Sequence, residues 1–121
     1  MTVTVLTMDE NLGTRDMLRS ALVEAGFRVV EAADGLHGLD MLRLEVPHVV
    51  ITGINMPGMD GFRFIETVRQ NAKYSSLPIL VLASENDDDK KMRARQAGAT
   101  GWIVRPFDPA RLISAIRRVA C

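Results

Sequence analysis

Cysteine is nearly absent from this chain, since Cys121 is the only cysteine among 121 residues and stands at the last position. A single thiol cannot form an internal disulfide framework. We therefore expect a cytoplasmic protein that depends on a packed core rather than on covalent cross-links. Cys121 is either a free thiol or the boundary of a segment, and the second interpretation is favoured.

Long apolar runs and an excess of charge of one sign are also missing. No run approaches the roughly 20 apolar residues of a membrane-spanning helix, and the start MTVTVLTMDE lacks the basic region of a signal peptide. Fifteen basic and fifteen acidic residues give a formal net charge of zero. We therefore expect no membrane association and no direct binding of nucleic acid.

The length of 121 residues fits one domain of ordinary size, covering residues 1–121. We find no internal repeat, low-complexity tract or linker that would divide it. The protein is expected to be a monomer or a weak dimer.

Five short β-rich runs are separated by segments with helical spacing. The predicted strands are Val3–Met8, Phe27–Ala32, Val49–Thr52, Ile79–Ala83 and Gly101–Val104. Strands that alternate with helices form a parallel sheet with right-handed crossovers. The predicted fold class is therefore α/β, a doubly wound five-stranded parallel sheet of the (βα)5 flavodoxin-like type, with strand order 2-1-3-4-5.

Apolar residues at helical spacing define the predicted helices. The first follows Asn11 and carries Leu12, Met17, Leu18, Ala21, Leu22 and Ala25. The second covers Gly35–Glu45, with an inner face of Leu36, Leu39, Met41 and Leu42. The third begins near Phe62 after Asp60, the fourth follows Asp89, and the fifth begins at Asp108-Pro109 and ends at Ala120.

The stretch VVITGINMPGMDGF, residues 49–62, predicts a buried strand, a loop and the start of a helix. Its loop lies at the carboxyl edge of the predicted sheet, where ligands of open parallel sheets bind. Asp9 and Glu10 follow the first strand and reach the same edge. With the backbone carbonyl of Asn55 they form an oxygen ligand set that Mg²⁺ accepts. An acidic cap on the first helix explains Asp9 and Glu10 equally well.

The motifs VLTMDEN, EAADG, NMPGMDG, LPILVLAS, QAGATGW and RPF resemble, in combination and in order, the receiver domain of bacterial two-component response regulators of the chemotaxis type. The resemblance covers nearly the whole chain. It implies two acids that hold Mg²⁺, an aspartate after the third strand that accepts a phosphoryl group from a histidine kinase, a Thr or Ser after the fourth strand, and a Lys before a cis proline.

Position by position, the resemblance assigns Asp9, Glu10 and Asn55 to the metal side of the site. The phosphoacceptor position is Gly53, which has no side chain. Ala83 stands at the hydroxyl position, and Arg105 replaces the lysine with a larger planar cation. The resemblance further makes Trp102 the aromatic switch residue and Pro106 the cis-proline candidate.

These departures favour a degenerate receiver: a non-enzymatic interaction module in phosphorelay signalling, with no cofactor or only weakly bound Mg²⁺. Its partner would be a histidine kinase, an effector domain or an output protein, bound through the face of the fourth helix, fifth strand and fifth helix. One alternative is a working phosphoacceptor receiver with an engineered or isolated substitution at Gly53, or one that uses another residue such as Ser84. A flavin or nucleotide module is disfavoured, because no glycine-rich phosphate loop follows the first strand.

Overall fold

The computed structural model describes residues 2–120, so Cys121 lies outside the described residues. The elements in chain order are β1 (Thr4–Met8), α1 (Leu12–Glu24), β2 (Arg28–Ala32), α2 (Gly35–Glu45), β3 (Val49–Thr52), α3 (Gly61–Arg69), the short 3₁₀ helix η1 (Ala72–Tyr74), β4 (Ile79–Ala83), α4 (Asp88–Ala97), β5 (Gly101–Val104) and α5 (Pro109–Ala120).

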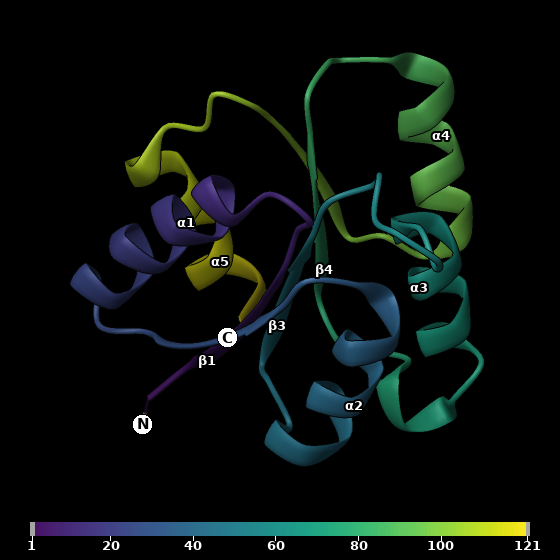
Figure 1. Cartoon of the computed structure of the whole chain (residues 1–121), viewed down its shortest axis with the longest axis horizontal. Helices are drawn as coiled ribbons and strands as arrows, with labels where there is room; N and C mark the ends of the chain where they lie inside the picture. The colour runs from purple at the N-terminus through teal and green to yellow at the C-terminus, as the bar shows by residue number, and fades with distance from the viewer. Residues whose placement is uncertain (1, 121) are drawn as a thin grey trace.

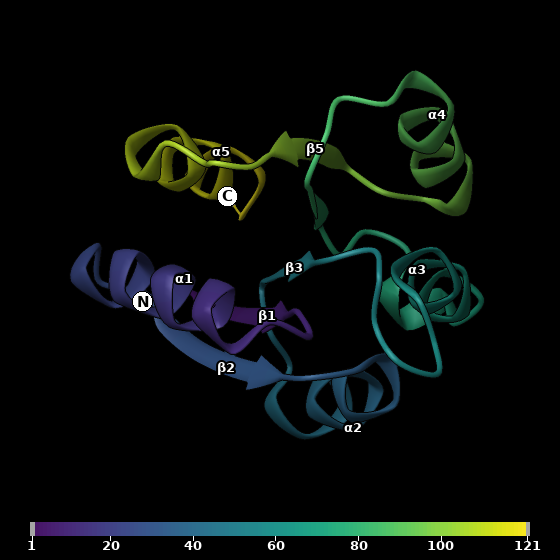
Figure 2. The ribbon, with the colours of Figure 1, turned by 45° about the horizontal axis from the view of Figure 1, so that its top comes forward.

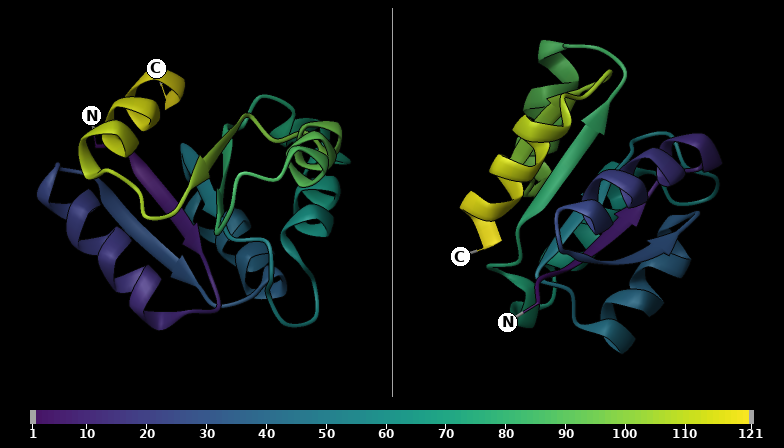
Figure 3. Two further views of the ribbon diagram at one scale, coloured as in Figure 1. Left: turned by 90° about the horizontal axis from the view of Figure 1, so that it is seen from above. Right: turned by 90° about the vertical axis from the view of Figure 1, so that its left-hand side faces the viewer.

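The five strands form one parallel sheet in the order β2-β1-β3-β4-β5, as predicted. Helices α1 and α5 cover one face, and α2, α3 and α4 cover the other (Figures 1 and 2). The two additional views show the same three layers (Figure 3). Within residues 2–120, no helix is long and apolar enough to cross a membrane.

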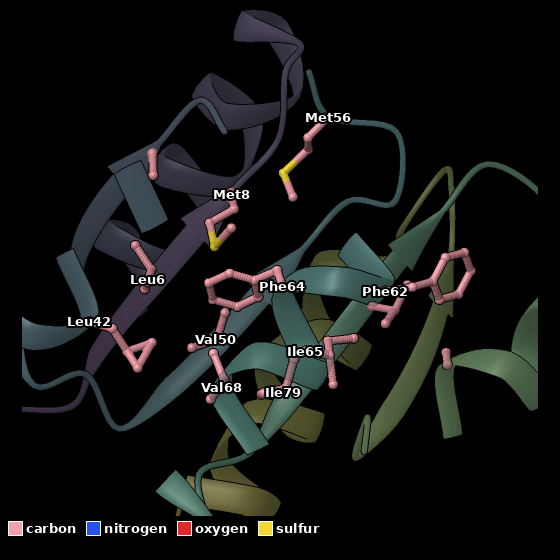
Figure 4. Packing of buried hydrophobic residues seen from close by; sticks show 13 residues of the cluster. Leu6, Met8, Leu42, Val50, Met56, Phe62, Phe64, Ile65, Val68 and Ile79 are labelled. Carbon is pink, nitrogen blue, oxygen red and sulfur yellow. The ribbon is translucent and has the colours of Figure 1, made fainter. Parts of the chain in front are cut away.

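The three interior strands, β1, β3 and β4, are the most deeply buried part of the sheet. Every residue of β3 and β4 is buried, as expected for continuous β-branched and apolar runs covered on both faces. Side chains of α3 fill one of the two layers between helices and sheet, where Phe64 points toward Met8 and Val50 (Figure 4). The other layer is closed mainly by leucines and isoleucines of α1 and α5.

Capping residues set where the helices begin. The side chains of Asn11, Asp34, Asp60 and Asp87 each accept a hydrogen bond from the backbone N–H three residues later, at the starts of α1, α2, α3 and α4. Each of these caps follows a strand end, so the caps also fix the loops at the carboxyl edge of the sheet.

The predicted inner face of α2 is partly wrong. Leu36 of α2 is 64% exposed, because α2 approaches β1 through Gly38, where a Cβ would lie 2.5 Å from the Met8 sulfur. This close contact turns Leu36 away from the core. On α1, Leu12 and Met17 are exposed as well, and the buried stripe is the i, i+4 pair Leu18 and Leu22.

Small differences occur at element boundaries. The first two strands begin one residue later than predicted, at Thr4 and Arg28. Phe27 is outside β2 but remains buried. The 3₁₀ helix η1 was not expected from its polar sequence. Helix α4 begins at Asp88, two residues earlier than predicted, because Asp87 caps it.

Two buried threonines give a paired prediction about stability. The Thr7 hydroxyl is fully buried and has no hydrogen-bond partner among residues 2–120, whereas the equally buried Thr52 hydroxyl donates to the Gly53 carbonyl at 2.8 Å. Thr7→Val should raise the free energy of unfolding by about 1 kcal/mol, and Thr52→Val should lower it by a similar amount. Urea unfolding of both variants checks this, and a loss of stability in Thr7→Val would contradict it.

Candidate functional site

A small cavity of about 50 Å³ opens at the carboxyl edge of the sheet, where β1, β3, β4 and β5 end. Its walls bring together the predicted site residues Asp9, Glu10, Gly53, Asn55, Ala83, Trp102 and Arg105. Pro106 lines a neighbouring hollow that shares Arg105 with this cavity. The strand ends therefore gather residues that are up to 96 positions apart, since Asp9 and Arg105 line the same cavity.

The two acidic residues differ in their surroundings. Asp9 has a side chain that is 4% exposed; its Oδ1 accepts the Asn11 N–H at 2.9 Å, and its Oδ2 lies 3.8 Å from the Arg105 guanidinium. Glu10 is exposed to solvent. Asp9 therefore contributes a buried negative charge to the cavity, and Glu10 stands at its rim.

Position 53 is filled by a neighbour rather than by a side chain of its own. The Gly53 N–H donates to the Met8 carbonyl at 2.8 Å, which extends the pairing of β3 with β1. A Cβ built on Gly53 would lie 2.7 Å from Asp9 Oδ2. The preceding Thr52 cannot serve as a substitute nucleophile, because it is fully buried and its hydroxyl is bonded to the Gly53 carbonyl.

The opposite wall comes from β4 and β5. Ala83 is buried and offers only a methyl group, and its carbonyl accepts the Arg105 N–H at 2.8 Å. Ser84 is exposed. Trp102 is half-buried, and its indole Nε1 has no hydrogen-bond partner within the described chain. Among the described residues that line the cavity, exposed Ser84 therefore carries the one hydroxyl group.

Arg105 makes a contact that the sequence did not suggest. Its Nη1 donates to the Thr14 hydroxyl at 3.1 Å, which links the segment after β5 to the first turns of α1 across 91 positions. The peptide bond between Arg105 and Pro106 is cis. Lys90, at the start of α4, also lines the cavity and pairs with Glu85 at 3.1 Å. Sequence position alone gave no signal for Thr14 or Lys90.

The donor set does not fit a magnesium ion held as the resemblance implies. Mg²⁺ gives up water reluctantly and is usually held by one or two carboxylates with other oxygen ligands. Here position 53 supplies no carboxylate, and the Asp9 carboxylate lies beside a guanidinium. Among residues 2–120, no group of three or more His, Cys, Asp or Glu side chains is placed to hold a metal.

The chain is similar in sequence to known signalling proteins. The response regulator receiver domain family matches residues 5–117. A probable chemotaxis protein CheY of Rhizobium etli is 32% identical over 118 residues, which are 97% of this chain and 92% of that protein. The sensor histidine kinase CheAY of Helicobacter pylori is 32% identical over 116 residues, but the chain spans only 14% of its length.

Solved structures agree with this assignment. The chemotaxis response regulator CheY4 of Vibrio cholerae superposes with a TM-score of 0.92 at 38% identity, covering 98% of this chain and 99% of that one. The fold, the position of the site and the sequence motifs therefore support the same family assignment. The chain belongs to the response regulator receiver domain family, whose members are modules of two-component and chemotaxis signalling.

Proposed function

We propose that this receiver domain acts as a phosphorylation-independent protein-interaction module and not as an enzyme or a phosphoacceptor. The observation that carries the proposal is Gly53 at the acceptor position, with the Asp9 carboxylate in the space that an acceptor side chain would occupy. An acyl phosphate requires a carboxylate nucleophile in line with the donor, and Gly53 supplies none.

Two further positions support the loss of the phosphorylation chemistry. Ala83 has no hydroxyl to bond a phosphoryl oxygen, and Arg105 directs its charge toward Asp9 and Thr14. Ser84 is a weaker candidate for an alternative acceptor, because it is exposed and has no hydrogen bond to a general base within residues 2–120. An isolated or engineered substitution at Gly53 remains the second candidate explanation, and the Gly53→Asp variant discussed below separates the two.

We place the partner on the face formed by α4, β5 and α5. Receiver domains interact with histidine kinases and output domains, and the proposed partner belongs to one of these classes. On α4 the apolar Met92 is 62% exposed, and a nearby hollow is lined by Lys91, Arg95 and Trp102. A cytoplasmic location and a monomeric or weakly dimeric state are parts of the same proposal.

Weak metal binding is the first expected consequence. Calorimetric titration with Mg²⁺ at physiological salt should give no heat of tight binding, because one carboxylate is missing and Arg105 lies beside another. The same titration on a receiver with an aspartate at the acceptor position provides the positive control. Tight binding by this chain would contradict the proposed role.

The second expected consequence concerns Trp102. Its fluorescence should not change when beryllofluoride and Mg²⁺ are added, since no carboxylate binds the phosphoryl mimic and Ala83 has no hydroxyl to follow it. Quenching by iodide before and after addition measures the exposure of the indole directly. A beryllofluoride-dependent change in intensity or quenching would show that the switch operates, and phosphorylation independence would then be wrong.

A further inference from the structure

The buried carboxylate of Asp9 needs a counter-charge. Its side chain is 4% exposed, and a buried carboxylate without a compensating partner is costly in free energy. The Asn11 N–H supplies one hydrogen bond but no full charge. Within residues 2–120, the one basic side chain that pairs with Asp9 is Arg105, whose Nη2 lies 3.8 Å from Oδ2.

Arg105 is held in this position from two directions. Its backbone N–H bonds to the Ala83 carbonyl at 2.8 Å, which fixes the end of β5 against β4. Its Nη1 bonds to the Thr14 hydroxyl at 3.1 Å. Thr14 is itself fixed, because its N–H donates to the capping side chain of Asn11 at 2.9 Å. The guanidinium is therefore oriented by a helix cap that follows directly after the acidic pair.

We infer that Arg105 is the resident counter-ion of Asp9, a charge supplied by the chain in place of a divalent metal, and that Thr14 is the positioning residue that orients it. The inference rests on the proposed function, since both require a site without bound metal. Its consequence is structural: the bond between Arg105 and Thr14 ties the segment after β5 to α1 without a bound ligand.

A double-mutant cycle on the full chain tests the pairing. Arg105→Gln should lower the thermal midpoint by about 5–10 °C, because it leaves Asp9 buried without a counter-charge. Adding Asp9→Asn should recover at least half of that loss, since the uncompensated charge is removed. Purely additive losses of the two substitutions would overturn the inference.

The effect of Mg²⁺ on the thermal midpoint distinguishes a counter-ion role of Arg105 from a role in packing alone. Mg²⁺ at millimolar concentration should raise the thermal midpoint of Arg105→Gln and leave that of the wild-type chain unchanged, because the ion can replace only a missing counter-charge. An equal response of both proteins would refute the assignment. Arg111→Gln is the matched control: Arg111 is 90% exposed and lies 3.9 Å from Asp108, so neither its midpoint nor its magnesium response should change.

Two further variants keep the test valid if Arg105→Gln does not fold. Arg105→Lys retains the charge and loses the bond to Thr14, so its midpoint should fall between those of wild type and Arg105→Gln. Thr14→Val should reduce the energetic coupling between positions 9 and 105 without abolishing it. If Thr14→Val leaves the energetic coupling between positions 9 and 105 unchanged, Thr14 does not position Arg105. The double-mutant cycle and the proposed function can fail separately. The cycle is decided by thermal midpoints, whereas the proposed function is decided by whether the chain becomes phosphorylated.

Discussion

Gly53→Asp is expected to convert a chain that takes no phosphate into one that is phosphorylated slowly by acetyl phosphate. The new carboxylate supplies the missing nucleophile and a third oxygen ligand beside Asp9 and Glu10. Intact-mass measurement should show one added phosphoryl group that hydroxylamine removes. Gly53→Asn, which has the same size but no carboxylate, is the matched control and should remain unmodified.

The structure adds a cost to this substitution. A Cβ at position 53 would lie 2.7 Å from Asp9 Oδ2, so the Asp9 carboxylate must move and then faces a second negative charge. Without metal the Gly53→Asp variant should be less stable than wild type. Mg²⁺ should restore part of that loss, because the ion neutralises both carboxylates.

Coupling to the partner face should remain poor in the single variant. Ala83 cannot hydrogen-bond a phosphoryl oxygen, and Arg105 presents its charge in a different geometry from lysine. Adding Ala83→Thr and Arg105→Lys should recover a donor-dependent change at Trp102. Fast phosphorylation together with a full Trp102 response in Gly53→Asp alone would show that an isolated substitution at Gly53 is the better explanation.

Gly61→Ala is expected to cause the largest loss of stability near the site. A Cβ on Gly61, the first residue of α3, would overlap the carbonyl oxygen of Gly53 and lie 3.0 Å from the Ile54 Cα. Both neighbours are backbone atoms, so relief requires a shift of the loop. The Gly61 N–H, which donates to the Ile54 carbonyl at 2.8 Å, would be displaced with it. We expect a loss of about 3 kcal/mol in the free energy of unfolding.

Urea unfolding checks this prediction, with Gly58→Asn in the same loop as the control. Gly58 has φ of 75° and no atom within 4 Å of a built Cβ, and asparagine tolerates this left-handed conformation. Its cost should stay below about 1 kcal/mol. Equal losses for the two variants would mean that the contact between Gly61 and Gly53 does not constrain the loop.

Much of the fold could be predicted from the sequence because local signals agree with one another. Continuous apolar runs such as Ile79–Ala83 indicate strands buried on both faces, and caps such as Asp60 and Asp87 indicate where helices begin. Leu36 shows the limit of this approach. Its outward orientation follows from the approach of Gly38 to Met8, a contact between distant segments that helical spacing does not report.

The candidate site also has features that the sequence predicts and features that it does not. The meeting of Asp9, Gly53 and Arg105 at one edge follows from topology, since parallel strands deliver their carboxyl ends together. The contacts within the site do not follow from topology. Which of the two acids turns inward, and which groups Arg105 binds, depend on side-chain conformations. Thr14 was missed for this reason, because only the position of the Arg105 side chain gives its hydroxyl a role.

The central claim, that this receiver does not accept phosphate, is tested most directly by intact-mass measurement of the wild-type chain after incubation with acetyl phosphate and Mg²⁺. Gly53→Asp, treated in parallel, shows that the donor is active. We expect the wild-type mass to remain unchanged while the variant gains a phosphoryl group. A hydroxylamine-sensitive gain of one phosphoryl group by the wild-type chain would contradict the claim, because it would require a carboxylate acceptor elsewhere in the chain.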